Sequence, residues 1–155
     1  MRKWIAFGLV LVTLAAFPLT ALAQTEQGTG WIVAEGDGAA YLRGAGWVRI
    51  SGSGTLLIRD RAGDAEIVVD GRGSRAENRG TLIYRGFDGN AYVRGSAITV
   101  ALRGEDIHLE AHGTGLVILR GEGWYRTGQA DHEVQGVWTA QGVRLQLLPT
   151  PTTAE

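Results

Sequence analysis

Apolar and polar residues alternate along most of this chain, in short segments that are separated by glycines. The segments Trp31 to Glu35 and Trp47 to Ser51 are typical. Such segments are too short for a stable helix but suit a short strand. Because strand side chains point alternately to two sides, each segment places its apolar residues on one side. The pattern predicts short strands with one buried face.

The predicted buried face is apolar throughout, whereas the opposite face carries charged side chains such as Arg49, Arg103 and Glu110. Such a division is typical of antiparallel sheets with one side in water. The predicted inward positions are Ile32/Ala34, Ala40/Leu42, Val48/Ile50, Leu56/Ile58, Ile67/Val69, Leu82/Tyr84, Ala91/Val93, Ile98/Val100/Leu102, Ile107/Leu109/Ala111 and Val117/Leu119.

The glycines form an internal repeat. One register consists of Gly-x-Gly triplets and the other of a basic residue followed by glycine. Glycines of this kind suit hairpin turns, in which one position often needs a positive φ. The triplets begin at Gly28, Gly36, Gly44 and Gly52, a period of eight, and return at Gly71, Gly113 and Gly121, while Arg85-Gly86, Arg94-Gly95, Arg103-Gly104 and His112-Gly113 recur every nine residues.

Together these patterns predict an all-β fold of about 10–12 short strands, arranged as an antiparallel meander that forms a sandwich or rolled barrel. The alternative is a β-solenoid or β-roll. A solenoid with two strands per turn would stack Arg85 beside Arg103 at about 4.8 Å, with like charges adjacent. This repulsion favours the meander.

The stretch from Gly44 to Gly123 resembles the glycine-punctuated β-repeat modules of bacterial secreted adhesin-like head domains and, more distantly, bactofilins. The resemblance implies a β-solenoid with a surface or matrix role and no catalysis. The calcium-binding nonapeptide rolls are similar in period, but this chain lacks their Gly-Gly-x-Gly-x-Asp core. The calcium sites of those rolls therefore cannot be carried over to this chain.

The N-terminus has the features of a secretory signal peptide over residues 1–23. Arg2 and Lys3 precede an apolar run, and Ala-Leu-Ala at 21–23 matches a signal-peptidase site. An uncleaved membrane anchor is the alternative, because the run is almost long enough to span a bilayer. Cleavage predicts an exported protein, periplasmic or extracellular, with no transmembrane segment afterwards.

Residues 24–148 are expected to form a single glycine-punctuated β-repeat domain, and the Pro/Thr-rich residues 149–155 a disordered tail. The chain has 15 basic and 16 acidic residues and no cysteine. That balance argues against nucleic acid as a partner. Polysaccharide or an envelope protein is the expected partner, and exposed strand edges allow self-association.

Aromatic residues form one candidate site. Trp31, Trp47 and Trp124 each follow a glycine at the start of a segment, and Tyr41 and Tyr92 fall in the outward register. Flat rings exposed on a rigid sheet can bind sugar rings or an apolar partner. The alternative is that these rings pack against a second sheet or a neighbouring subunit.

A second candidate is a metal site on one strand. Asp106, His108, Glu110 and His112 point to the same side, with next-but-one residues about 6.6 Å apart, and two of them could share a metal. The alternative is a hydrated strand face, because His112 takes the place that arginine fills in the other repeats.

The sequence carries no Walker loop, dinucleotide fingerprint or Gly-x-Ser-x-Gly elbow, and no cofactor or enzymatic activity is expected. The predicted function is a non-enzymatic structural or interaction module of the bacterial cell envelope. A carbohydrate-binding module that uses the tryptophans is the first alternative. A metal-dependent enzyme at His108 and Glu110 is the second.

Overall fold

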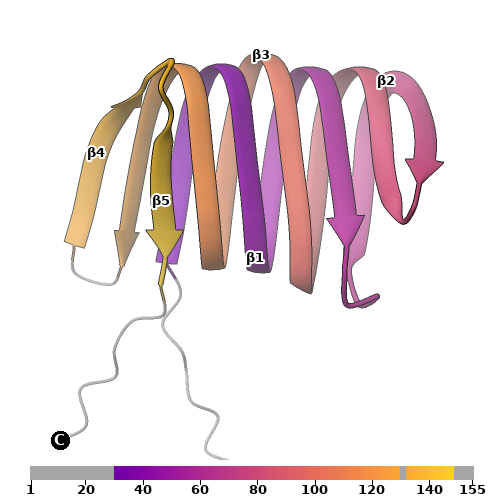
Figure 1. The fold of residues 1–155 in the computed structure, drawn as a ribbon, viewed down its shortest axis with the longest axis horizontal. Helices are drawn as coiled ribbons and strands as arrows, with labels where there is room; N and C mark the ends of the chain where they lie inside the picture. Colours follow the sequence, from indigo (N-terminus) through magenta and orange to yellow (C-terminus); the bar gives the residue numbers. More distant parts are fainter. Residues whose placement is uncertain (1–29, 130–131, 149–155) are drawn as a thin grey trace, which may run out of the picture.

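Five strands make up the described part of the chain (Figure 1). The computed structural model describes residues 30–129 and 132–148. These ranges contain no helix, and every strand pair is antiparallel, which confirms the predicted all-β, antiparallel class. The strands are β1 (Gly30–Asp60), β2 (Glu66–Asn78), β3 (Thr81–Gln129), β4 (His132–Trp138) and β5 (Val143–Leu147).

Strands β1 and β3 wind around a common axis as a two-stranded spiral (Figure 1). Val48 of β1 pairs with Val93 on one side and with Ala111, one turn later in β3, on the other. In the same way, Leu102 of β3 pairs with both Ala40 and Leu56. Each glycine-bounded segment of β1 is therefore half a turn of a continuous strand.

The number and connection of the strands differ from the 10–12 short strands of a meander. β1 has 31 residues and β3 has 49, and the segments of β1 pair with β3 instead of with each other. The glycines bend the chain without reversing it. Gly44, for example, lies opposite Gly115, and a Cβ on Gly44 would stand 1.9 Å from the carbonyl oxygen of Thr114. Glycine is needed here for the close approach of two strands.

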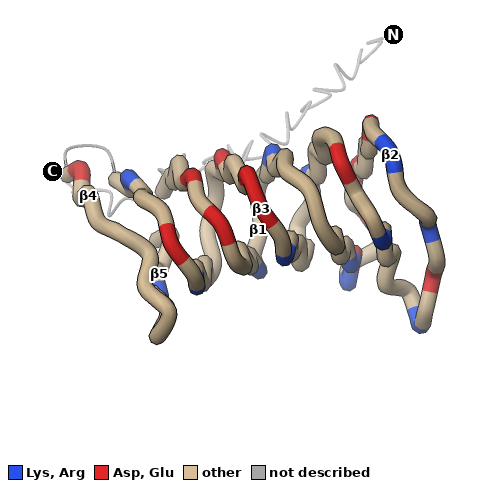
Figure 2. The backbone as a smooth tube through the Cα atoms, turned by 90° about the horizontal axis from the view of Figure 1, so that it is seen from above, with Lys and Arg blue, Asp and Glu red and all other residues tan. Residues whose placement is uncertain are grey.

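The spiral is flattened into two walls that meet along two edges (Figures 1 and 2). At the upper edge of Figure 1, β4 ends and β5 begins, and the lower edge lies opposite. The first wall consists of β4 and residues 123–129, 30–36, 107–113, 46–52, 89–95 and 66–71, and the second wall of β5 and residues 115–121, 38–44, 98–104, 54–60, 81–87 and 73–78.

The core lies between the walls and is apolar. The predicted inward residues between 32 and 58 and between 91 and 119 are all buried, as alternation predicted. The inward residues of the last turn, Ile67, Val69, Leu82 and Tyr84, are only partly buried, because β2 is an edge strand there. Among the described residues, no polar or charged side chain is buried.

Three buried residues were not predicted and help to close the ends of the core: Phe87, Trp138 and Leu147. Phe87 follows Gly86, whose φ of 61° is left-handed, and its ring contacts Tyr84 edge to face. At the other end, Trp138 packs into the core while its Nε1 donates to the carbonyl oxygen of Trp124 at 2.9 Å. The buried indole is thereby satisfied.

The predicted signal peptide at 1–23 and the predicted tail at 149–155 lie outside the described residues. Within the described ranges, no helix is available to cross a membrane. Apart from these segments, the strands belong to one sheet that surrounds one core.

Candidate functional site

The outer face of the first wall gathers most of the aromatic residues predicted to bind a ligand. Trp31, Trp47, Tyr92 and Trp124 all lie in segments of this wall, at outward positions. Tyr41 lies on the outer face of the second wall. The structure therefore brings four of the predicted rings to one face and separates the fifth from them.

Two of these rings stack on their neighbours. The Trp47 ring lies 4.6 Å from the His112 ring at an interplanar angle of 18°, and 6.4 Å from the Tyr92 ring. Trp31 lies over Gly128, since a Cβ on that glycine would come within 2.8 Å of the Trp31 Nε1. These contacts use part of the ring faces for packing within the protein. The predicted ligand-binding role of the rings stays a prediction.

Trp124 is the most accessible of the four rings. It is 39% exposed, and the Arg126 guanidinium lies 5.9 Å from its ring centroid. This geometry is that of an exposed cation–π pair.

The predicted metal ligands lie side by side on β3 and point outward, but each contacts a different neighbour. His108 Nδ1 lies 3.0 Å from Glu35 Oε1, Glu110 lies 3.6 Å from Arg49, and His112 stacks on Trp47. Within the described ranges, no three His, Cys, Asp or Glu side chains are placed to hold one metal ion. A zinc or nickel titration with His108→Ala as the control tests this prediction directly.

The outer face of the second wall is basic. Its arginines are exposed, and none of them forms an ion pair with any described residue. Its outward positions include no Asp or Glu. We call this surface the arginine face, and its arginines are Arg43, Arg59, Arg85, Arg103, Arg120 and Arg144.

An apolar row crosses the middle of the arginine face. It consists of residues that neighbour each other across five strand segments, and its most exposed member, Leu57, is 37% exposed. Arg85, Arg103 and Arg120 lie on the side of this row toward the upper edge, and Arg43 and Arg59 on the side toward the lower edge. The residues of the apolar row are Ile118, Tyr41, Ala101, Leu57 and Ile83.

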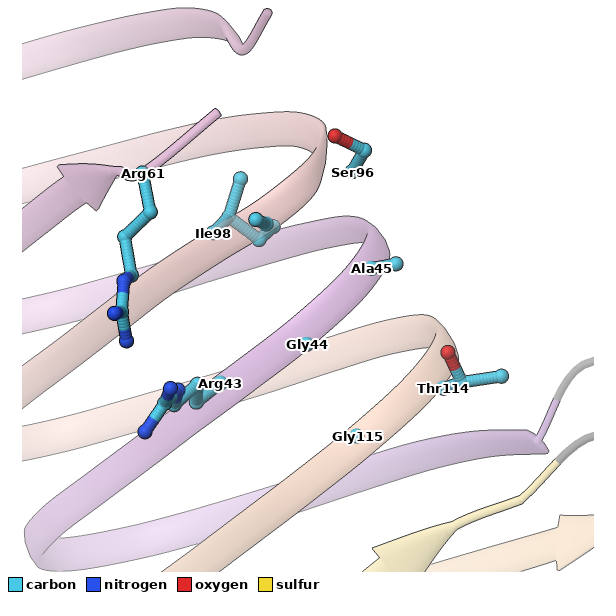
Figure 3. A pocket seen from close by; sticks show the side chains of 9 residues that line it. Arg43, Gly44, Ala45, Arg61, Ser96, Ile98, Thr114 and Gly115 are labelled. Carbon is cyan, nitrogen blue, oxygen red and sulfur yellow. The ribbon is translucent and has the colours of Figure 1, made fainter. Parts of the chain in front are cut away.

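A shallow hollow at the lower edge adds a further cation (Figure 3). Arg43, Arg61, Ser96 and Thr114 are among its lining residues. The guanidinium groups of Arg43 and Arg61 extend toward the same side of the hollow in Figure 3. Arg61 follows β1, and its amide donates to the carbonyl oxygen of Ala97 at 2.9 Å. The arginine face thus continues to this edge.

The upper edge is acidic, as the red segments across the nearest turns in Figure 2 show. Asp37 and Asp106 meet at this edge, where the Asp106 amide donates to Asp37 Oδ1 at 2.7 Å. The exposed acids of this edge are Asp37, Asp88, Glu105, Asp106 and Glu122. Charge is therefore separated between one edge and one wall.

One carboxyl group in the turn between β1 and β2 has a perturbed pKa. Hydrogen bonds from the side chain and the backbone of Ser96 hold the pKa of Asp64 below its ordinary value of 3.8. The amide of Ser96 lies 3.1 Å from Asp64 Oδ1. This contact ties the turn to β3.

The arginine face was not predicted from the sequence, although its repeat was visible. Arg85 and Arg103 fall on the second wall, whereas Arg94 and His112 fall on the first, because successive repeats occupy opposite walls. The sequence could have revealed this face if outward positions had been assigned alternately to the two walls, one glycine-bounded segment after another.

No protein-family model, curated protein or solved structure matches this chain. Its function is therefore inferred from its own residues.

Proposed function

We propose that this chain is a non-enzymatic interaction module of the bacterial cell envelope, exported to the periplasm or the cell exterior. The observation that carries the proposal is the arginine face, a flat surface whose cations have no ion-pair partner among the described residues. Unpaired charges of one sign on a rigid face suit binding to an external partner of the opposite sign.

The core supports a binding role over a catalytic one. Catalytic groups commonly acquire their reactivity from burial beside a second charge or in a low-dielectric cleft. Here the described core contains only apolar side chains, and the ionisable groups lie at the surface. The spiral therefore acts as a scaffold that presents two broad outer faces.

Co-sedimentation with envelope fractions tests this function. The exported chain, purified after processing, is mixed with outer-membrane, inner-membrane and cell-wall fractions and then centrifuged. We expect it to pellet with at least one fraction without changing that fraction's composition, and its mature N-terminus to be Gln24. The heat-unfolded chain is the control. Recovery in every supernatant, or release of a soluble product from a fraction, would contradict the proposal.

The carbohydrate-binding alternative is supported by the rings on the first wall, above all by Trp47 beside Tyr92 and by the exposed Trp124. Titration with cell-wall polysaccharides, followed by tryptophan fluorescence, tests it. Trp47→Ala should abolish a saturable response, and Tyr41→Ala on the opposite wall should keep it. Equal responses in both variants would exclude this face as the sugar site.

A further inference from the structure

We infer that the arginine face docks flat on the surface of an anionic phospholipid membrane, with its arginines at the lipid headgroups and its apolar row against the outermost acyl region. This inference names the partner of the module and rests on the proposed envelope function.

The arginines lie on a regular grid. Arg85 and Arg103 both neighbour Thr55 from opposite sides, which places their backbones about 10 Å apart. The two rows of arginines on either side of the apolar row are about 13 Å apart along the strands. At low salt, like charges at these separations repel each other, and none of these arginines forms an ion pair with a described acid. A flat anionic surface could lie close to all of these arginines at once and offset the repulsion between them.

The apolar row favours a membrane over a hydrated polyanion. From Ile118 to Ile83 it runs for about 19 Å across neighbouring strands, in line between the two rows of arginines. A linear polyanion could pair with either row of arginines but would leave the apolar row in water. A lipid surface accepts both, because arginine stems reach headgroups while apolar side chains enter the interface.

The geometry also argues against a second copy of the chain as the occupant. Two arginine faces placed against each other would bring cations opposite cations, for example near Arg59 and Arg103. The Arg43 and Arg61 hollow at the lower edge adds two donors that suit a phosphate group. Both features point to a phospholipid headgroup layer as the partner.

Vesicle co-sedimentation of the exported chain tests the inference. Vesicles of phosphatidylcholine with about one third phosphatidylglycerol are compared with pure phosphatidylcholine vesicles, at low and high salt. We expect binding to the anionic vesicles only, weakened by salt. Since each basic residue near such a surface strengthens binding about fivefold, Arg43→Gln/Arg59→Gln/Arg103→Gln should weaken it by about 100-fold.

The first wall supplies the matched control, Arg49→Gln/Arg94→Gln/Arg126→Gln, which removes the same charge and should weaken binding less than fivefold. Leu57→Ser should weaken binding about fivefold and remove the part that persists at high salt. Circular dichroism melting of each variant separates lost binding from lost folding.

Three results would overturn the inference. They are equal binding to neutral and anionic vesicles, equal losses in the two triple variants, and tighter binding to soluble polyphosphate than to vesicles with no effect of Leu57→Ser. If vesicles fail but an envelope fraction still retains the chain, only the lipid partner is wrong. If both fail, the envelope function fails with it.

Discussion

Both walls contain segments of β1, β2 and β3 and the same repeat, yet their outer faces differ in how charge is balanced. On the first wall, Arg49 lies 3.6 Å from Glu110, and Arg126 lies 3.6 Å from Glu133. On the second wall, Arg59 and the other arginines of the arginine face form no ion pair with any described residue.

This difference separates what the fold requires from what it leaves free. Inward positions on both walls must be apolar, because they fill one shared core. Outward positions face solvent, where either charge is compatible with the strand. The accumulation of arginine on one wall is therefore not a requirement of folding, and it is the feature that points to a partner.

The largest expected effect on stability comes from a glycine at an edge where the two walls meet. Gly104 lies opposite Gly38 and Gly54, and a Cβ there would stand 1.8 Å from the carbonyl oxygen of Ser53. Gly104→Ala should lower the free energy of unfolding by about 3 kcal/mol or more, since the backbone of Ser53 and Gly54 would have to move. Urea unfolding measures this loss.

Gly63→Ala is the control for that substitution. Gly63 has a φ of 79° but no atom within 4 Å of its would-be Cβ, and only the backbone strain of about 1–2 kcal/mol applies. Comparable losses in the two variants would show that close strand approach is not what the edge glycines provide.

The next largest effect on stability distinguishes the inner face of the second wall from its outer face. Leu102 is fully buried, whereas Leu57 lies in the apolar row on the outer face. Leu102→Ala should cost about 2–5 kcal/mol of unfolding free energy through the cavity that it leaves, and Leu57→Ala less than about 1 kcal/mol. Denaturant titration of both variants checks the ratio. A larger loss for Leu57 would mean that the arginine face is packed, not open.

The sequence predicted which side chains are inward but not which wall they occupy. Alternation determines the parity of each position, so Val48 and Val93 could be assigned to the core from local sequence. The wall on which these residues lie depends on the pairing of Val48 with Val93 and Ala111. Because these partners are distant in the chain, the local sequence does not reveal the pairing.

Local departures from alternation also escaped prediction. Phe87 turns inward because Gly86 adopts a left-handed conformation, which interrupts the count of positions along β3. The candidate side chains Tyr41 and Tyr92 lie at outward positions, as alternation predicted. Their grouping was not foreseen, because a meander would have placed Tyr41 and Trp47 differently from the two walls of a spiral.

A smaller effect compares arginines across the walls. Arg49→Gln removes the ion pair with Glu110 and should cost about 0.2–1 kcal/mol at low salt, because both side chains are partly exposed. Arg59→Gln breaks no ion pair and should leave stability unchanged or slightly raised, since repulsion within the arginine face falls. Thermal melting at low and high salt measures both. A difference that survives 1 M salt would assign the effect to packing instead of charge.

The smallest effect lies in the turn where the chain passes from the second wall to the first. Hydrogen bonds from Ser96 hold the pKa of Asp64 below 3.8, so the folded state binds this proton less readily than the unfolded chain. The stabilisation is present above the unfolded pKa and disappears as pH falls through the lower folded value. Asp64→Asn should therefore make the loss of stability below about pH 4 slightly shallower.

Ser96→Ala sharpens the same measurement, because it removes the hydroxyl and keeps the amide that donates to Asp64 Oδ1 at 3.1 Å. It should produce part of the change seen in Asp64→Asn, since the side-chain hydrogen bond is the larger of the two causes. Melting temperatures between pH 2 and pH 6, recorded for both variants and the native chain, report the slope. A steeper acid decline in either variant would reverse the sign of the linkage and show that the turn is held by other contacts.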